Sequence, residues 1–269
     1  MTDAHSEVAD QTSFDIDLQG HRALVTGAGQ GVGRAIAGAL ASAGAEIVVN
    51  DFVVERAVAA VEELTALGAT AQAAPFDVSD FDATLAAIGN AGVDIIVNNA
   101  GNAGPQGFTF TSFADSGPAD WDRYFAVNLY GVLHCTRAVL PGMIEQGWGR
   151  IITIVSEAGR SGEPGLAAYS AAKAGAAGFT RSIAREVGRH GINANNVALA
   201  SIDSSGYMAR DDLPPEELER QAKQLRAYII RRYGRPDDVA AMCLFLASPL
   251  AEWITGQTYP VNGGYAVNQ

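Results

Sequence analysis

The sequence predicts an α/β fold: a single doubly wound parallel sheet with helices on both faces. Two observations predict it. Short apolar runs of strand length alternate with longer amphipathic runs along the 269 residues, and several apolar runs end in a polar side chain. A chain of this length could form two domains, but no linker breaks the alternation, so one domain covers residues 16–269. Residues 1–15 are acidic and polar without an apolar core, so we expect a flexible tail, neither a signal peptide nor a membrane anchor.

The first half of the chain supplies the start of a nucleotide-binding strand–helix–strand unit. Its strands are short and apolar, and its first two helices stop at Gly44 and Gly68, because glycine readily adopts the torsions that end a helix. We expect strands over residues 22–26, 46–50, 73–76 and 94–97, and helices over 34–43, 54–67 and 84–88.

The second half continues the same alternation. One helix is long, and another ends at Gly191. We expect strands over residues 150–155, 194–199 and 257–261, and helices over 121–146, 169–190 and 239–247. The segment at about 201–235 is polar and contains Pro214 and Pro215, which suits a mobile helical flap.

Four polar side chains stand where predicted strands end. They are Thr26, Asp51, Asp77 and Asn98. Ligands of open parallel sheets bind beyond the carboxyl ends of the strands, so we expect these four side chains to line one crevice.

A glycine-rich turn, Thr26-Gly27-Ala28-Gly29-Gln30-Gly31-Val32-Gly33, joins the first strand to the first helix. Gly27, Gly31 and Gly33 permit a tight turn, close approach of a pyrophosphate and close helix packing, while the helix N-terminus offers amide donors. Turn chemistry alone is the alternative. Because the turn follows a strand and precedes a helix, we predict a Rossmann-like dinucleotide site that includes Gln30 and Val32.

Asp51 indicates which dinucleotide binds. Its carboxylate can accept hydrogen bonds from the adenosine ribose, and its charge would repel a 2′-phosphate, so NAD is favoured over NADP. The alternative is that Asp51 caps the helix that follows. Arg34 could hold a phosphate, but an arginine there is more often exposed. Candidates for the adenine and ribose sides of the crevice are Asp77, Val78, Asn98, Ala100 and Gly101.

Tyr169 and Lys173 stand at i and i+4, on one helix face, and Ser156 ends a strand 13 residues earlier. With Asn128 and the closing Asn262-Gly263-Gly264, these motifs resemble the short-chain dehydrogenase/reductase family over nearly the whole chain. The enoyl-reductase branch, which is similar, separates its Tyr and Lys more widely.

The resemblance implies a catalytic tetrad of Asn128, Ser156, Tyr169 and Lys173 and an alcohol/ketone interconversion by hydride transfer. It implies that Tyr169 moves the hydroxyl proton, Ser156 holds the substrate oxygen, Lys173 also binds the nicotinamide ribose and Asn128 positions a water. A cation about 4 Å away at an effective dielectric of about 20 contributes on the order of 4 kcal/mol, enough to lower a phenol pKa by about three units without a metal. Singly, each residue has an ordinary structural explanation; together they favour the tetrad.

One departure leaves a rival open. Family members usually carry Pro-Gly where this chain has Leu199-Ala200, which puts the loop beside the nicotinamide in doubt, although Ile202 and Ser204 can still reach the carboxamide. A nucleotide-binding regulator with little turnover is therefore the alternative function. Residues 201–235 would be the substrate flap.

Composition bounds the partners. The chain has 18 Lys plus Arg against 30 Asp plus Glu, a net charge of −12, which disfavours nucleic acid and anionic membranes. No apolar run approaches the roughly 20 residues needed to span a bilayer. Cys135 and Cys243 suit a core better than a disulfide or metal site. We expect a cytoplasmic enzyme for a small alcohol or ketone, and the resemblance implies a homotetramer or homodimer.

Overall fold

The chain folds around one seven-stranded parallel sheet. The computed structural model describes residues 15–101, 109–206, 210 and 212–267. The strands lie in the order β3-β2-β1-β4-β5-β6-β7, and every neighbouring pair is parallel. Their bounds are β1 Arg22–Val25, β2 Glu46–Val49, β3 Ala71–Ala73, β4 Ile95–Asn98, β5 Gly149–Ser156, β6 Ile192–Leu199 and β7 Thr258–Val261. The predicted α/β, doubly wound, Rossmann-like sheet is confirmed.

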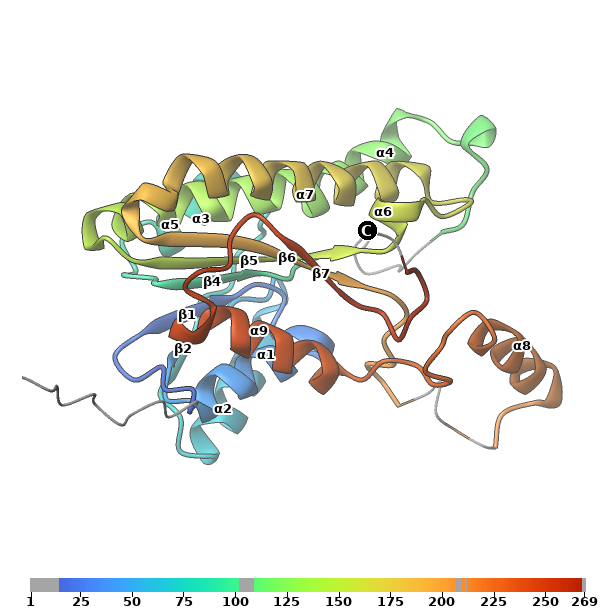
Figure 1. Ribbon diagram of the computed structural model, residues 1–269, viewed down its shortest axis with the longest axis horizontal. Coiled ribbons are helices and arrows are strands. Elements are labelled where there is room, and N and C mark those ends of the chain that lie inside the picture. The colour runs from blue at the N-terminus through green and yellow to red at the C-terminus, as the bar shows by residue number, and fades with distance from the viewer. Residues whose placement is uncertain (1–14, 102–108, 207–209, 211, 268–269) are drawn as a thin grey trace, which may run out of the picture.

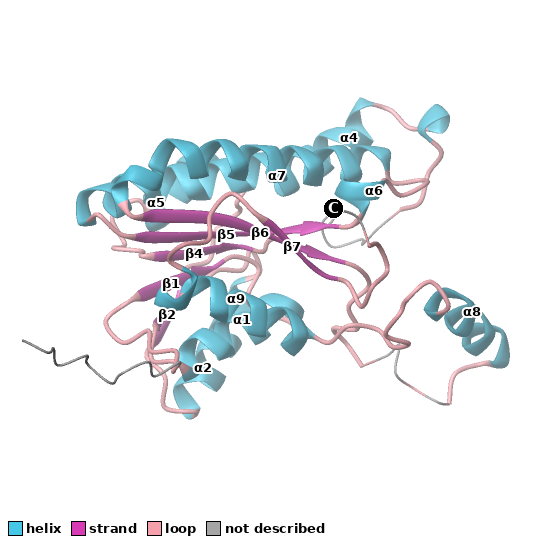
Figure 2. Ribbon diagram, in the orientation of Figure 1, coloured by secondary structure: helices cyan, strands magenta, loops and turns pink. Residues whose placement is uncertain are grey.

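Helices cover both faces of the sheet (Figures 1 and 2). One layer holds α1, α2 and α9, and the opposite layer holds α3, α5 and α7. The helix bounds are α1 Gly31–Ser42, α2 Val54–Ala66, α3 Phe81–Ile88, α4 Pro118–Phe125, α5 Gly131–Gln146, α6 Ala158–Ser161, α7 Ala167–Val187, α8 Pro215–Leu225 and α9 Pro236–Ala247. Among the described residues, no helix is both long enough and apolar enough to cross a membrane.

Alternation along the buried strands builds a core on each side of the sheet. In β4, Ile95 packs with the α1, α2 and α9 layer, whereas Ile96 packs with the α3 and α5 layer. Val25 and Leu24 of β1 divide in the same way. Successive side chains of a strand point to opposite faces, so strands covered on both sides are apolar throughout.

The strand order places the binding crevice. The connections run from β1 outward through β2 to β3, and then return to β4 on the other side of β1. The loops after β1 and β4 therefore leave the sheet in opposite directions and open a crevice between them. Thr26 and Asn99 immediately follow these two strands.

One predicted strand was misplaced. The sequence placed the third strand at 73–76, but β3 is Ala71–Ala73 and ends four residues before Asp77. Beyond β3, the Asn50 side chain holds the backbone in place of strand pairing. Its Nδ2 donates to the backbone oxygens of Ala74 at 3.1 Å and Phe76 at 3.0 Å. A side chain therefore holds the segment that an apolar run suggested would be a strand.

The predicted long helix over 121–146 is built from three parts. α4 leads into a π-helical turn, Ala126–Tyr130, which leads into α5. The π turn places Asn128 in the interior, fully buried. Such turns insert one extra residue and often occur at functional sites.

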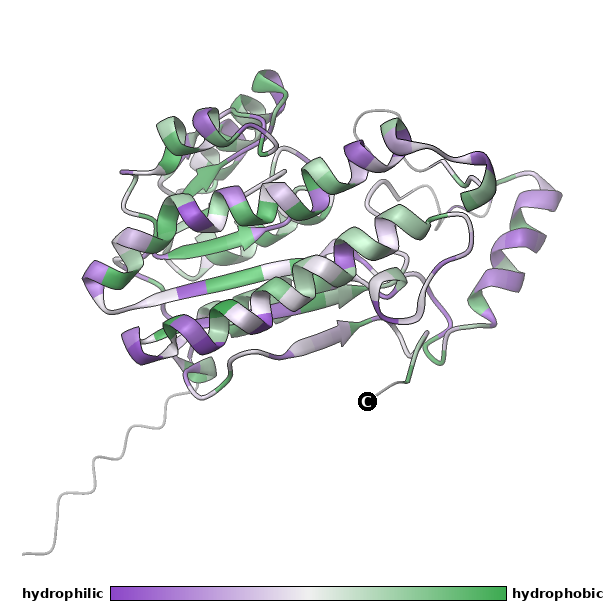
Figure 3. Cartoon of the chain, turned by 90° about the horizontal axis from the view of Figure 1, so that it is seen from above, coloured by the Kyte–Doolittle hydropathy of each residue, from purple (hydrophilic) through white to green (hydrophobic). Residues whose placement is uncertain are grey.

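The flap region contains α8, which is anchored at its base. Ile202 forms a parallel bridge with Gly234, and Gln224 of α8 donates to Ser201 Oγ at 3.2 Å and accepts from the Tyr233 hydroxyl at 2.9 Å. In Figure 3 the helix is mostly hydrophilic and stands away from the sheet. Positions 207–209 and 211 of the predicted flap, and residues 1–14 of the predicted tail, lie outside the described residues.

Candidate active site

A cavity of about 790 Å³ opens at the carboxyl ends of the strands. Its lining runs from the glycine turn to the helix that carries Tyr169, so it joins the two motifs that the sequence singled out. The predicted residues that line it are Gly27, Gln30, Gly31, Val32, Gly33, Asp51, Asp77, Val78, Ala100, Gly101, Ser156, Tyr169, Lys173, Ile202 and Ser204.

The glycine turn forms a cradle that larger residues would fill. Gly27 and Gly31 have φ of +63° and +56°, torsions that favour glycine. A Cβ on Gly33 would lie 2.4 Å from the backbone oxygen of Gly27 and 2.5 Å from Asn99 Nδ2. Gly33 therefore allows α1 to pack closely against the turn, and the turn and the N-terminus of α1 both line the cavity, so these residues fit a dinucleotide.

Thr26 and Asn99 lock the turn to the end of β4. Thr26 Oγ1 accepts from the backbone amides of Asn99 at 3.0 Å and Ala100 at 2.9 Å. Asn99 Nδ2 donates in return to the backbone oxygens of Thr26 at 2.8 Å and Gly27 at 3.2 Å. These reciprocal bonds fix both walls of the crevice.

Asp51 faces the glycine turn and is buried. Its Oδ2 accepts from the Gly29 amide at 3.3 Å, and its Oδ1 accepts from the Val53 amide at 3.0 Å. The N-cap of α2 is Val53, so Asp51 is not the N-cap residue, although it does bind the turn that precedes the helix. A Cβ on Gly29 would lie 2.6 Å from Asp51 Oδ2. Gly29, which the sequence analysis did not single out, is therefore what allows this carboxylate to lie against the turn.

Arg56 and Phe52 line the cavity and escaped prediction. Arg56 belongs to the first turn of α2, beside Asp51, and supplies a cation on the adenosine side of the site. Arg34, the cation that the sequence offered as a phosphate ligand, instead pairs with Glu63 of α2 and does not line the cavity.

Asn98 is not in the crevice. Its side chain is 2% exposed, its Nδ2 donates to Thr136 Oγ1 of α5 at 3.1 Å, and it does not line the cavity. The prediction that the Asn98 side chain lines the crevice is wrong. The last residue of β4 points into the α3 and α5 layer, and the next residue, Asn99, faces the cavity.

Ser156 and Tyr169 meet at the inner wall. Ser156 ends β5, and Tyr169 stands in the first turn of α7, where 8% of its surface is exposed. Their side chains are hydrogen-bonded to each other. Ser156 Oγ also accepts from the Ala158 amide at 3.1 Å while facing the cavity.

The pKa of Tyr169 differs from the prediction. Burial raises it to about 12, and the hydrogen bond from Ser156 lowers it only in part. The sequence argument expected the neighbouring ammonium to lower it. Removing a phenolate from water costs more here than its surroundings return, so the cofactor-free protein keeps Tyr169 protonated.

Lys173 is buried beneath Tyr169. Its Nζ donates to the backbone oxygen of Ile154 at 2.8 Å and lies 5.9 Å from the centre of the Tyr169 ring. Burial lowers the pKa of Lys173 to about 8. Its ammonium can therefore release a proton near physiological pH, which an ordinary lysine does not do.

Asn128 approaches Lys173 from the π turn. Its Nδ2 donates to the backbone oxygen of Tyr124 at 3.0 Å. A Cβ on Gly101 would lie 3.1 Å from both Asn128 Oδ1 and Lys173 Nζ, so these two atoms face one small volume. The structure thus brings all four predicted tetrad residues together, although Asn128 does not itself line the cavity.

A buried carboxylate supports the end of β5. Glu157 is 2% exposed, and its Oε1 accepts from Arg160 Nη1 at 2.7 Å and from Asn262 Nδ2 at 3.1 Å. These bonds tie the residue after Ser156 to the segment that follows β7. Among the described residues, no group of His, Cys, Asp and Glu side chains is arranged to hold a metal ion.

Leu199 and Ala200 leave the site open. Leu199 is the last residue of β6 and pairs with both Ser156 and Val261, and its backbone oxygen accepts from the Glu157 amide at 2.9 Å. Leu199 and Ala200 both line the cavity. Leu199 therefore continues β6 beside Ser156, and Ala200 follows the strand along the cavity wall.

A parallel sheet of this order with a glycine cradle at its switch point defines a Rossmann-like nucleotide-binding protein. The chain belongs, more narrowly, to the short-chain dehydrogenase/reductase family: a family model described as Enoyl-(Acyl carrier protein) reductase matches residues 27–266. The resemblance predicted from sequence is confirmed.

Relatives share this assignment but differ in substrate. A 7alpha-hydroxysteroid dehydrogenase of Escherichia coli (strain K12) is 36% identical over 259 residues, covering 94% of this chain and 96% of that protein. A 3-oxoacyl-[acyl-carrier-protein] reductase of Aquifex aeolicus (strain VF5) is 37% identical over 257 residues, covering 93% and 99%. A crystal structure of a gluconate 5-dehydrogenase from Burkholderia cenocepacia J2315 in complex with NADP and tartrate has a TM-score of 0.84 at 33% identity, covering 94% and 98%. The protein is therefore an oxidoreductase of this family.

Proposed function

We propose that this protein interconverts a secondary alcohol and a ketone, with Tyr169 as the acid/base and with NAD preferred over NADP. The observation that carries the proposal is that Ser156, Tyr169 and Lys173 line the same cavity as the glycine cradle. A substrate oxygen beside Ser156 and Tyr169 would therefore lie within reach of a dinucleotide held by the turn.

The residues present fit a dinucleotide at both ends. The N-terminus of α1 and the backbone of Gly31 to Gly33 would hold the pyrophosphate, Asp51 the adenosine ribose, and Asp77 and Val78 the adenine. Ile202 and Ser204 would hold the carboxamide. When bound, the nicotinamide accepts a hydride from the alcohol carbon or donates one to the ketone carbon.

The chain's own groups move the proton. Ser156 donates to the substrate oxygen and orients it. In ketone reduction, Tyr169 donates its proton to the oxygen as negative charge develops there, and its high pKa keeps that proton available. In alcohol oxidation, Tyr169 must first lose the proton, and a charged Lys173 favours the phenolate. Asn128, which faces Lys173 across Gly101, would hold a water that exchanges protons with Lys173.

The relatives and the Tyr169–Lys173 spacing favour a class of reaction but do not identify the substrate. The family model carries an enoyl-reductase description, but the four-residue step from Tyr169 to Lys173 favours the alcohol and ketone branch. The relatives named above act on a steroid, a carrier-bound acyl group and a sugar acid. We therefore propose a small-molecule alcohol or ketone without choosing among them.

Preference for NAD rests on Asp51, which is 4% exposed and held against the glycine turn. A 2′-phosphate beside it would meet a fixed negative charge. Arg56 in the same cavity offers a competing attraction, and the gluconate dehydrogenase structure contains NADP, so Asp51 must outweigh Arg56 for NAD to be preferred.

Cofactor preference is tested by replacing the carboxylate. We expect Asp51→Ala, and Asp51→Asn with its similar shape, to raise the NADP/NAD ratio of kcat/KM by about tenfold or more, because a like-charge contact is removed. Asp82→Ala on the exposed start of α3 is the matched control. An unchanged ratio in both Asp51 variants would show that Asp51 only supports the turn.

The family resemblance and the composition support an assembly and a location for the protein. We propose a homodimer or homotetramer that acts in the cytoplasm, with no nucleic-acid or membrane partner. The net charge of −12 supports the exclusion of polyanions. Light scattering of the purified protein would test the assembly.

The experiment that tests the proposed function is turnover measured by nicotinamide absorbance over a panel of secondary alcohols and ketones, with all four dinucleotides. We expect turnover with at least one alcohol–ketone pair, faster with NAD(H). Tight NAD binding without turnover across the panel would favour the nucleotide-binding regulator instead.

A further inference from the structure

Tyr124 lies behind the proposed catalytic tyrosine. It stands next to last in α4 and is 5% exposed. Its ring meets the Tyr169 ring edge to face, with centroids 5.9 Å apart and an angle of 64° between the planes. With Leu166 the two tyrosines form a small apolar cluster at the start of α7. Tyr124 therefore forms part of the wall that keeps water from Tyr169.

The same residue holds a second member of the tetrad through its backbone. Asn128 is fully buried in the π turn, and its Nδ2 donates to the Tyr124 oxygen at 3.0 Å. With its amide nitrogen engaged, Asn128 turns Oδ1 toward Gly101 and Lys173. One residue of α4 thus contacts Tyr169 through its ring and Asn128 through its carbonyl.

The Tyr124 hydroxyl takes no part in either contact. It is buried and has no hydrogen-bond partner among the described residues. A buried unpaired hydroxyl costs free energy rather than supplying it, so the geometry assigns the contact with Tyr169 to the ring.

We propose that Tyr124 is a positioning residue: its ring fixes the direction and dryness of the Tyr169 phenol, and its carbonyl fixes the Asn128 amide. The proposal rests on the proposed function, because it gives Tyr124 an effect on turnover through two tetrad residues. It adds a residue outside the motifs that the sequence pointed to.

The proposal predicts in which direction the pKa of Tyr169 moves when the Tyr124 ring is removed. The titratable groups that contact the Tyr169 ring are Lys173 on its own helix and Tyr124 on α4, and the nearby Tyr124 also raises the pKa of Tyr169. Ser156 of β5 is its neutral partner. Burial is the main cause of the raised pKa, so removing the Tyr124 ring admits water, stabilises the phenolate and moves ionisation of Tyr169 to lower pH.

The test compares Tyr124→Leu, which removes the ring, with Tyr124→Phe, which removes only the hydroxyl. Tyr130→Leu, at an exposed position six residues along the same helical stretch, is the matched control. For alcohol oxidation by the full-length protein, we expect Tyr124→Leu to lower kcat about 10- to 100-fold, because misplaced reacting groups cost that much. KM and the Kd for NAD should stay within about twofold, and the pH limb of kcat should move about half a unit or more to lower pH.

Tyr124→Phe should keep kcat within about threefold, because the ring remains, and should move the pH limb less than Tyr124→Leu, because only the repulsion between the two tyrosine hydroxyls is lost. A Tyr124→Leu variant with normal kcat, or one changed only in KM, would overturn the proposal. So would a Tyr124→Phe variant as impaired as Tyr124→Leu, since the hydroxyl would then be the active part. Loss of kcat with an unmoved pH limb would reduce Tyr124 to general support of the fold.

A readout independent of turnover separates this proposal from the proposed function. In protein labelled with carbon-13 at the tyrosine ring carbon that bears the hydroxyl, the Tyr169 resonance is identified by its loss in Tyr169→Phe. We expect this resonance to broaden or split in Tyr124→Leu and to stay single in Tyr124→Phe and Tyr130→Leu. A single sharp resonance in Tyr124→Leu would refute the positioning role even if no substrate had been found.

Discussion

The two ends of β5 both bury a cation, and they do so in opposite ways. At the carboxyl end, Ile154 accepts from Lys173 and Ser156 faces the cavity. At the amino end, Arg150 is 2% exposed and is the second residue of the strand, at the end opposite the cavity. The strand therefore joins a site that can change protonation to one that keeps its charge.

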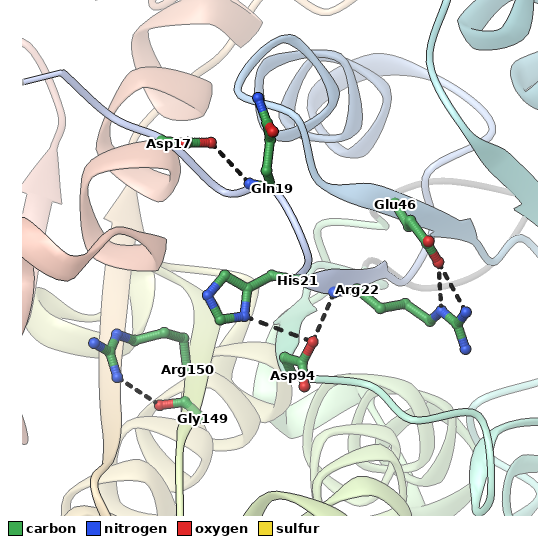
Figure 4. Close-up of polar contacts among 8 residues, drawn as sticks. All are labelled: Asp17, Gln19, His21, Arg22, Glu46, Asp94, Gly149 and Arg150. Atoms are coloured by element: carbon green, nitrogen blue, oxygen red, sulfur yellow. Dashed lines mark hydrogen bonds and ion pairs between the residues drawn. The ribbon is translucent and has the colours of Figure 1, made fainter. Parts of the chain in front are cut away.

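The amino end stabilises its cation with several partners. Arg150 Nη1 donates to the backbone oxygens of Gly149 at 3.0 Å and Gly191 at 3.4 Å, and its guanidinium lies 4.3 Å from the centre of the Trp148 ring (Figure 4 shows the bond to Gly149). Burial lowers the pKa of Arg150, but nearby Glu252 opposes the shift. An arginine keeps its proton under these conditions, so the group serves as a fixed support.

The carboxyl end of β5 gives its cation, Lys173, fewer stabilising partners. Lys173 donates to the Ile154 oxygen, and no carboxylate of the described residues lies within ion-pair distance of it. Burial without a compensating charge lowers the pKa of Lys173 to about 8. The protein therefore leaves Lys173 poorly compensated in the site where we propose proton transfer, and compensates Arg150 where only support is needed.

The largest effect is expected at the carboxyl end. We predict that Tyr169→Phe lowers kcat about 10³-fold, because general acid/base catalysis contributes on that order. The Kd for NAD should stay within about twofold, and the melting temperature should not fall. Stopped-assay turnover and fluorescence titration measure the two quantities. Near-normal kcat would show that Tyr169 does not transfer the proton. The carboxyl end of β5 would then have no proposed catalytic role to compare with the amino end.

Lys173→Met should lose turnover and gain stability. Lowering a lysine pKa from 10.5 to about 8 corresponds to about 3 kcal/mol, from which loss of the bond to Ile154 takes about 1 kcal/mol. We therefore predict a variant more stable by about 2 kcal/mol at pH 7 in urea unfolding.

The pH dependence fixes the sign of that gain. The folded protein releases the Lys173 proton at about 8 and the unfolded chain at about 10.5, so the unfolded chain binds more protons between these values. Wild-type stability should rise by about 3 kcal/mol relative to Lys173→Met across this window, so the advantage of the variant should be full below about pH 8 and should reverse by about 1 kcal/mol near pH 10.5, where only the lost bond to Ile154 remains. A gap that does not change with pH would show that burial of the charge is not its cause.

Arg150→Met should act in the opposite direction. Its loss leaves two backbone oxygens and the Trp148 face without their cation, so we predict a loss of about 1 to 2 kcal/mol of stability. The kcat at a temperature well below unfolding should be unchanged. A more stable Arg150→Met protein would erase the contrast between the two ends, because both cations would then be costs.

Local patterns in the sequence predicted the parts of the site that local geometry controls. Gly27, Gly31 and Gly33 sit in one turn, and the step from Tyr169 to Lys173 is one helical turn, so each set is fixed by its own backbone. The alternation of strands and helices along the chain also followed, because alternation and strand-end polarity are properties of neighbouring residues.

Other parts depend on contacts between distant segments. Asn98 and Asn99 are adjacent, and only the register of β4 decides which of them faces the cavity. Arg56 lines the cavity because of the angle at which α2 leaves β2. The pKa of Tyr169 depends on how deeply the packed helices bury it, a quantity that residue spacing does not contain.

The smallest predicted effect tests whether the two ends are independent. His21 stacks on Trp148 with ring centroids 4.0 Å apart. Its Nδ1 also lies 3.6 Å from Asp94 Oδ2, which accepts from the Arg22 amide at 2.8 Å (Figure 4 shows these two contacts of Asp94). We predict that His21→Ala lowers stability by about 0.5 to 1 kcal/mol in urea unfolding, the usual worth of such a ring contact.

The more informative measurement on His21→Ala is kcat. Because Arg150 keeps its backbone partners in this variant, β5 should hold its position, and kcat and its pH profile should match those of the wild type. A drop in kcat larger than about threefold, about 0.6 kcal/mol in activation free energy, would mean that a change at the amino end reaches Ser156 along the strand. In that case the two ends of β5 would form one coupled unit, and the environments of Arg150 and Lys173 would not be independent.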